Sequence, residues 1–244
     1  SEMCIRDSYR RAQGKNNRNF KDGKYFMKAL KAIGKFIGFI LLAILLLFVI
    51  IYGIIAYQTS RTRINYQDEI YEYSEKYNVD PLLTASIIKV ESDFNKDAQS
   101  HQDAKGLMQL LDQTASHAAE LTNKEFHPEK LSEVEYNLDL GLAYYDYLYR
   151  YYNNRDLALA AYNGGVGNVD KWINEGIVDA TNPNPLDIPF EETRQYVTKI
   201  DANYDVYKKF YKNGLPSKER LANLKQLAFD NFMTFLEDII SNVR

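Results

Sequence analysis

The chain has 244 residues, enough for one or two domains, and 45% of them are hydrophobic while 26% are charged. Its charge is uneven, because residues 1–35 hold ten Lys and Arg against three Asp and Glu, whereas the remaining residues hold 20 against 30. The acidic remainder argues against a nucleic-acid ligand, which would need a basic surface, and the single cysteine, Cys4, leaves that part without disulfides or cysteine metal ligands.

The first predicted element is a membrane-spanning helix at residues 36–57, FIGFILLAILLLFVIIYGIIAY, which contain no charged side chain. As a helix this segment would span about 33 Å, close to the roughly 30 Å hydrocarbon core of a bilayer. Because the basic segment 1–35 precedes it, the positive-inside rule predicts a cytoplasmic N-terminus and an extracellular or periplasmic remainder. A cleaved signal peptide would have a shorter apolar core and a small-residue cleavage site. We therefore expect a single-pass signal anchor in the cell membrane, followed by a short linker at 58–65.

Beyond the linker, helical periodicity dominates and strand alternation is nearly absent, which predicts an all-α domain over residues 66–213. The Asp-Pro pair at 80–81 is typical of an N-cap and a first-turn proline, and the apolar helix that follows ends near Glu91. Asp112 is expected to cap a short helix. These signals predict at least two helices, with Glu91 at the edge of an apolar stripe.

The second half of the domain carries further helix signals. Ser132 and Glu135 are spaced as a capping box, and Leu131 and Tyr136 as a hydrophobic staple, before a helix that runs to about Tyr152. The glycines at 164, 165 and 167 are read as a helix stop and turn. Pro189 should open a last long helix, closed by Gly214 and Pro216. Residues 214–244 are predicted to form an amphipathic helix, for which packing against the domain is favoured over binding a protein partner.

Glu91 is weak evidence of catalysis by itself, because a glutamate near a helix end is usually solvated. Three sequence blocks around it change that interpretation. They are ESDFNKDAQSHQDAKGLMQLLDQTA (91–115), NLDLGLAYYDYLYRYYNNRDLALAAYNGGVGNVDKW (137–172) and IPFEETRQYV (188–197). In this order, over roughly residues 66–212, they resemble the lytic transglycosylase family of the soluble type, which shares its fold with goose-type lysozyme.

This resemblance implies a lysozyme-like helical fold and a single catalytic glutamate, Glu91, acting on peptidoglycan glycan strands. In the family the glutamate acts first as acid and then as base on the C6 hydroxyl of N-acetylmuramic acid, and releases a 1,6-anhydro sugar. The matching positions that would bind substrate or orient the acid are Ser100, Met108, Gln109, Tyr162, Asn163 and Tyr196. Each also has a structural interpretation: Ser100 could cap a turn, Asn163 could end a helix and Tyr196 could belong to the core. No cofactor is implied, and the three histidines lack the spacing of metal ligands.

Two positions depart from the family pattern. Asp103 stands where the family usually has glycine; aspartate tolerates left-handed backbone better than most residues, but it adds a charge near the cleft and could hold a water. Asp112 stands where the family usually has proline, and either residue can begin a helix. The first departure leaves a lysozyme-like muramidase open as an alternative. A second alternative is a non-catalytic wall-binding scaffold that recruits a protein partner through its C-terminal helix.

Overall fold

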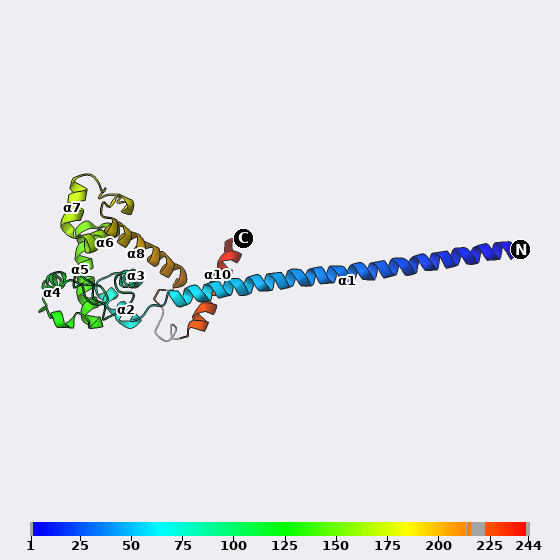
Figure 1. The fold of residues 1–244 in the computed structure, drawn as a ribbon, viewed down its shortest axis with the longest axis horizontal. Coiled ribbons are helices and arrows are strands. Elements are labelled where there is room, and N and C mark those ends of the chain that lie inside the picture. Colours follow the sequence, from blue (N-terminus) through cyan, green and yellow to red (C-terminus); the bar gives the residue numbers. More distant parts are fainter. Residues whose placement is uncertain (1, 213, 216–222, 243–244) are drawn as a thin grey trace. The chain divides into compact units, whose positions relative to one another are not determined.

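The structure is a computed structural model that describes residues 2–212, 214–215 and 223–242. It divides into two units, residues 1–55 and 56–244, which are considered separately. The first unit consists of most of α1 (Glu2–Arg61), one continuous helix (Figure 1). Within α1, residues Leu30–Ser60 are long and apolar enough to cross a membrane, and their most apolar 18-residue stretch has a mean hydropathy of 3.2. This candidate span contains the predicted segment 36–57, and α1 stays helical into the predicted linker.

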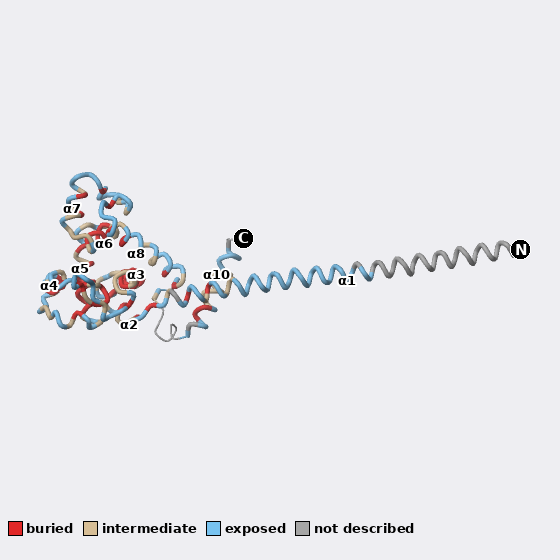
Figure 2. Tube along the Cα trace, in the orientation of Figure 1, coloured by how far each residue is buried: buried red, intermediate tan, exposed pale blue. Residues whose placement is uncertain are grey.

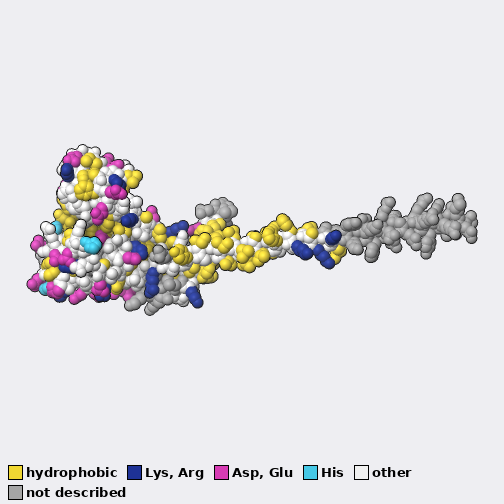
Figure 3. All heavy atoms as spheres, viewed as in Figure 1, with side chains coloured by type: hydrophobic (Ala, Val, Ile, Leu, Met, Phe, Trp, Pro, Cys, Tyr) yellow, Lys and Arg dark blue, Asp and Glu magenta, His cyan; other side chains and the backbone are white. Residues whose placement is uncertain are grey.

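Apolar side chains on α1 face outward rather than into a protein interior. Phe36, Phe39 and Leu41 are each more than 60% exposed. Figure 2 shows this exposure along the described part of α1, and Figure 3 shows apolar side chains covering it, whereas both charge signs appear over the second unit. Because water solvates such a surface poorly, the exposed stripe fits a lipid environment.

The second unit is all-helical within the described residues, as the sequence predicts. Its α-helices are α2 (Gln67–Lys76), α3 (Pro81–Glu91), α4 (Asp112–Leu121), α5 (Val134–Tyr152), α6 (Arg155–Gly164), α7 (Val166–Asn174), α8 (Glu191–Phe210) and α10 (Leu224–Asn242). Two short 3₁₀ helices, η1 (Pro128–Lys130) and η2 (Pro185–Asp187), lie in the connections.

The centre of the second unit is α3, which packs against α8 and against α2. Every side chain from Leu82 to Ile88 is buried, and Ile87 and Ile88 are fully enclosed by the main core. The predicted start of α3 is confirmed, because the Asp80 carboxylate accepts a hydrogen bond from the backbone N–H of Leu82 at 2.8 Å. Such a cap contributes about 1 kcal/mol. A rigid, buried and well-capped helix therefore carries Glu91 at its last position.

Two predicted caps are wrong. Asp112 is the first residue of α4 rather than its cap, and its carboxylate pairs with Lys105 at 3.0 Å. The capping box at Ser132 does not form, because α5 begins at Val134 after Glu133, which makes no side-chain cap bond. At Asp112 the ion pair with Lys105 replaces the expected capping bond.

The glycine-rich segment after α6 also differs from the prediction. Of the three glycines read as a turn, Gly165 alone has a left-handed backbone, with φ 85°, and it is the single residue between α6 and α7. The helix α7 was missed because its glycines obscured a short apolar face on which Val169 and Trp172 are buried. Gly164 sits in a tight corner, since a Cβ there would lie 2.9 Å from the hydroxyl of Thr193 on α8. The junction of α6 and α7 is thus fitted against the start of α8.

The last predicted helices have different bounds in the structure. The helix expected to open at Pro189 runs from Glu191 to Phe210, and Gly214 lies beyond it. Pro216 and the first residues of the predicted C-terminal helix lie outside the described residues. In α10, Leu227 and Ala228 are buried. The interpretation of α10 as a helix that packs against the domain is consistent with this burial, and a partner-binding role stays a prediction.

Candidate active site

Glu91 is the last residue of α3 and is only partly accessible to solvent. The hydroxyl of Tyr196, on α8, donates a hydrogen bond of 2.6 Å to Oε1 of Glu91. Tyr196 itself is 5% exposed, so its ring belongs to the core while its hydroxyl faces the carboxyl group. The two residues are 105 positions apart and meet because α3 packs on α8.

Burial raises the pKa of Glu91 to about 7, and the hydrogen bond from Tyr196 acts in the opposite direction because it favours the ionised form. Desolvation therefore outweighs the hydrogen bond. A carboxyl group with this pKa is partly protonated at neutral pH, and it can both donate and accept a proton there. This is the property that a general acid and base requires.

The segment Gly106–Gln109 forms a tight turn that Asn137 of α5 holds in place. The side-chain amide of Asn137 donates to the carbonyls of Lys105 (3.0 Å) and Leu131 (2.8 Å), and its oxygen accepts from the backbone N–H of Met108 (2.8 Å). Asn137 is 1% exposed, so all three bonds are shielded from water. Gly106 has φ 78°, and a Cβ there would lie 2.2 Å from the Asn137 nitrogen. The turn consequently needs both the glycine and the asparagine.

Met108 lies at the centre of this turn and is fully buried. Its thioether packs on Gly141 of α5, where a Cβ would lie 2.4 Å from the sulfur. The hydroxyl of Tyr162, from α6, donates to the carbonyl of Met108 at 2.9 Å. Ser92, which follows Glu91, donates to the carbonyl of Leu107 at 2.8 Å. The turn is thereby tied to α5, to α6 and to the end of α3 that carries Glu91.

Tyr162 is close enough to Glu91 that the negative charge of the carboxylate contributes to raising the tyrosine pKa, after burial as the larger cause. The same two causes raise the pKa of Tyr196. Both phenols therefore stay protonated, and each acts as a hydrogen-bond donor. Of the predicted site residues, the structure brings Tyr162 and Tyr196 to Glu91 and places Met108 in the turn that Tyr162 and Ser92 hold beside it.

Two other predicted residues stabilise the loop between α3 and α4. The Ser100 hydroxyl accepts from the backbone N–H groups of Gln102 (3.2 Å) and Ala104 (3.0 Å), which makes it a turn cap. The Gln109 amide donates to the carbonyls of Ala98 (3.1 Å) and Gly106 (3.0 Å). These bonds give both side chains a structural task in the loop.

Asn163 and Asp103 lie at more open positions. Asn163 is exposed on the last turn of α6, next to Tyr162. Asp103 has φ 66°, so aspartate occupies a left-handed position as its tolerance for that backbone predicts. Its carboxylate accepts a hydrogen bond from Gln99 and lies 3.5 Å from Lys105. The hydrogen bond from Gln99 is the largest of the causes that lower the pKa of Asp103. Asp103 is therefore an ionised, loop-bound carboxylate.

Sequence reasoning missed Asn137 and Thr193 as residues that support the site. Both belong to the blocks that carry the family resemblance, at the start of Asn-Leu-x-x-Gly and within Glu-Thr-Arg, but their burial and contacts depend on the packing of α5 and α8. Among the residues that the structure describes, no three His, Cys, Asp or Glu side chains gather in a way that could hold a metal ion.

Comparison with known proteins agrees with this geometry. Residues 68–181 match the family model described as Transglycosylase SLT domain. The soluble lytic murein transglycosylase of Salmonella typhimurium is 35% identical over 64% of this chain, and the membrane-bound lytic murein transglycosylase C of Edwardsiella ictaluri is 30% identical over 59%. The aligned parts amount to 24% and 46% of those relatives, so this chain spans less than half of their length.

A solved structure shows the same fold. The 70 kDa soluble lytic transglycosylase of Escherichia coli superposes with a TM-score of 0.58 and 29% identity, over 65% of this chain and 26% of the other. The helices that carry Glu91, Tyr162 and Tyr196, with the turn that carries Met108, thus form a lysozyme-like domain. Residues 68–181 therefore form a domain similar to the transglycosylase SLT domain.

Proposed function

We propose that this chain is a membrane-anchored lytic transglycosylase that cleaves the MurNAc–GlcNAc bond of peptidoglycan, with Glu91 as the single acid and base. One observation carries the proposal: the carboxyl group of Glu91 is shielded from water, has a pKa of about 7 and accepts a 2.6 Å hydrogen bond from Tyr196. The names of the related proteins, which describe them as lytic murein transglycosylases, support the same activity.

In the first step, Glu91 donates its proton to the glycosidic oxygen while the bond from that oxygen to C1 of MurNAc breaks. The hydrogen bond from Tyr196 occupies Oε1, so the transferable proton resides on Oε2 and can face the substrate. The 2-acetamido group of the substrate assists departure of the leaving group. An acid that still holds its proton at neutral pH is required because an alkoxide is a poor leaving group.

In the second step, the carboxylate of Glu91 takes the proton from the C6 hydroxyl of the same MurNAc residue. Oxygen O6 bonds to C1, closing the 1,6-anhydro ring, and Glu91 returns to its protonated form. The sequence of steps consumes no water, and one residue serves as acid and base because its pKa lies near the working pH. Burial disfavours the charged carboxylate, so it favours the return of Glu91 to its protonated form at the end of each cycle.

The other site residues position the substrate or the acid. We assign Tyr162 to the wall of the substrate site beside Glu91, where its hydroxyl bonds to the carbonyl of the fully buried Met108, and Asn163 offers an exposed amide next to it. Ser100 and Gln109 shape the loop that borders the cleft, and substrate contacts of both would add to the loop bonds that they make.

Isotope labelling of the products tests the reaction type. Purified full-length protein in detergent would digest sacculi in ¹⁸O-labelled water, and the fragments would be analysed by mass spectrometry. We expect 1,6-anhydroMurNAc ends without ¹⁸O. Reducing ends that carry ¹⁸O would instead identify a muramidase. The Asp103→Gly variant should give the same products as the parent chain, because Gln99 and Lys105 already engage its carboxylate.

The domain is placed outside the membrane by the proposed anchor at 36–57, with the basic segment 1–35 in the cytoplasm. Cysteine labelling tests this orientation, because Cys4 is the only cysteine in the sequence. In intact cells, or in spheroplasts if an outer membrane is present, a membrane-impermeant maleimide should label a cysteine introduced by Tyr71→Cys, at an exposed position of α2, and should spare Cys4. Labelling of Cys4 alone would indicate the opposite orientation.

A further inference from the structure

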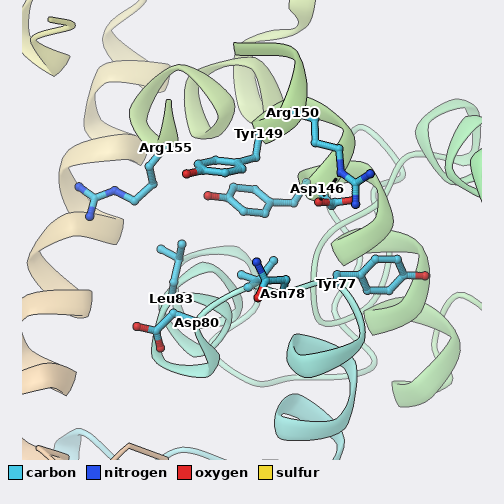
Figure 4. A pocket seen from close by; sticks show the side chains of 10 residues that line it. Tyr77, Asn78, Asp80, Leu83, Asp146, Tyr149, Arg150 and Arg155 are labelled. Atoms are coloured by element: carbon cyan, nitrogen blue, oxygen red, sulfur yellow. Dashed lines mark hydrogen bonds and ion pairs between the residues drawn. The ribbon is translucent and has the colours of Figure 1, made fainter. Parts of the chain in front are cut away.

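A cavity lies at the opposite end of α3 from Glu91, between α5 and the turn that joins α2 to α3 (Figure 4). Its volume is about 380 Å³, within the range of roughly 300–1,000 Å³ that is usual for small-molecule sites. Leu83 lines it, eight residues before Glu91, which is about 12 Å along a helix. The lining residues are Tyr77, Asn78, Val79, Asp80, Leu83, Tyr145, Asp146, Tyr149, Arg150 and Arg155.

Tyr145 and Tyr149 of α5 both line this cavity, and Figure 4 draws Tyr149 above Asn78 and Asp80. The rings of Tyr145 and Tyr149 are nearly parallel, with an interplanar angle of 24° and centroids 6.4 Å apart. Tyr145 is 2% exposed and fixes the pair in the core, whereas Tyr149 is 44% exposed. The ring of Tyr149, which packs against Tyr145, is therefore open to a ligand in a cavity that Asn78 and Asp80 also line.

The charged groups that line the cavity are already paired. Arg150 makes two bonds to the Asp146 carboxylate, at 3.0 and 2.9 Å. Arg155 bonds to the carboxylates of Asp156 (3.0 Å) and Asp201 (2.7 Å), and so is doubly neutralised.

Asp80, the remaining charged group of the lining, accepts bonds from the N–H of Leu82 and from the hydroxyl of Tyr204. A charged ligand would have to displace these partners. The free energy lost in breaking the existing ion pairs would exceed the small gain from new, solvent-exposed ones. A neutral ligand can instead bind while these ion pairs persist. Its hydroxyl groups can donate to unused carboxylate lone pairs and accept from unused guanidinium N–H groups.

An aromatic face beside neutralised, planar polar groups matches one chemical class. The C–H face of a pyranose ring is apolar and packs on an aromatic ring, while its equatorial hydroxyl and acetamido groups point to the side. We propose that this cavity binds a neutral N-acetylhexosamine ring of the glycan and holds the strand at a second position, away from Glu91. The identity of the glycan rests on the proposed function, but binding at Tyr149 does not require catalysis.

Binding to insoluble peptidoglycan tests this site. The full-length chain carrying Glu91→Gln, which prevents cleavage, would be co-sedimented with purified wall with and without Tyr149→Ala. Loss of one ring contact should raise the Kd about fivefold or more. Tyr149→Phe keeps the ring and should restore binding, while Tyr71→Ala, which removes an equally exposed tyrosine from α2, should leave the Kd unchanged.

The chemical class is tested by competition. Soluble tri-N-acetylchitotriose should displace the Tyr149-dependent part of the binding, whereas a free stem peptide should not. The proposal is overturned if Tyr149→Ala and Tyr71→Ala bind alike, or if only the peptide competes. The parent chain and the single variant Tyr149→Ala, both with Glu91 intact, should cleave a short soluble glycan at the same rate. Failure of the second site therefore leaves the catalytic proposal standing, and failure of catalysis leaves this binding measurement valid.

Discussion

Replacing Glu91 by glutamine should stabilise the folded chain at high pH, because it removes a carboxylate that the fold shields from water. The pKa of Glu91 rises from its ordinary value of 4.5 to about 7. Each tenfold change in proton affinity is worth about 1.4 kcal/mol, so keeping the ionised form of Glu91 in the folded chain costs about 3 kcal/mol. Below pH 4.5 both folded and unfolded chains hold the proton, and the penalty is absent. Between pH 4.5 and 7 the folded chain alone holds the proton, so the free energy of unfolding falls as pH rises.

Urea unfolding of the purified protein in detergent, followed by the fluorescence of Trp172, measures this effect. The free energy of unfolding of Glu91→Gln minus that of the parent chain should grow by about 3 kcal/mol from pH 4 to pH 8. Glutamine keeps an acceptor for the Tyr196 hydroxyl, so the hydrogen bond at that position can persist. As a control, Glu120→Gln replaces an exposed carboxylate on α4 and should show no comparable trend. A difference for Glu91→Gln that does not change with pH would refute the account of its burial.

Other substitutions test the support of the site. Tyr196→Phe removes the bond that lowers the pKa of Glu91, so the pKa should rise further and the pH–rate profile should shift to higher pH. Asn137→Ala leaves the N–H of Met108 and the carbonyl of Leu131 without a partner and should cost about 3 kcal/mol or more in urea unfolding, together with activity. Gly141→Ala would overlap the neighbouring thioether and should cost about 1–3 kcal/mol in the same assay. Gly167→Ala meets open space in α7 and should instead stabilise by about 0.5–1 kcal/mol.

The position of Glu91 at the end of a buried helix could be predicted from the sequence, because its determinants are local. The Asp-Pro pair at 80–81 begins α3, the apolar run places it in the core, and polar residues follow Glu91. The all-helical class follows from the same periodicity. The apolar segment at 36–57 is likewise recognisable by itself, because crossing a membrane depends on length and composition.

The contacts that shape the site could not be predicted, because they join residues distant in sequence. Asn137 reaches back 29 residues to Met108, and Tyr196 reaches back 105 residues to Glu91. The Ser100 hydroxyl accepts two backbone N–H bonds because of the loop conformation, which its own position in the sequence does not specify. Local motifs mislead where another contact competes, as at Asp112, whose carboxylate pairs with a lysine instead of capping α4.

The most direct test of the central claim is the release of soluble fragments from purified sacculi by the parent chain and by Glu91→Gln. Glutamine preserves the shape of the side chain and an acceptor for Tyr196, but it can neither donate the proton to the glycosidic oxygen nor take one from the C6 hydroxyl. General acid–base catalysis typically contributes about 10²–10⁴-fold, so the rate should fall by at least about 100-fold while binding to the sacculi persists. A Glu91→Gln chain that releases fragments at the parent rate would contradict the assignment of Glu91 as acid and base.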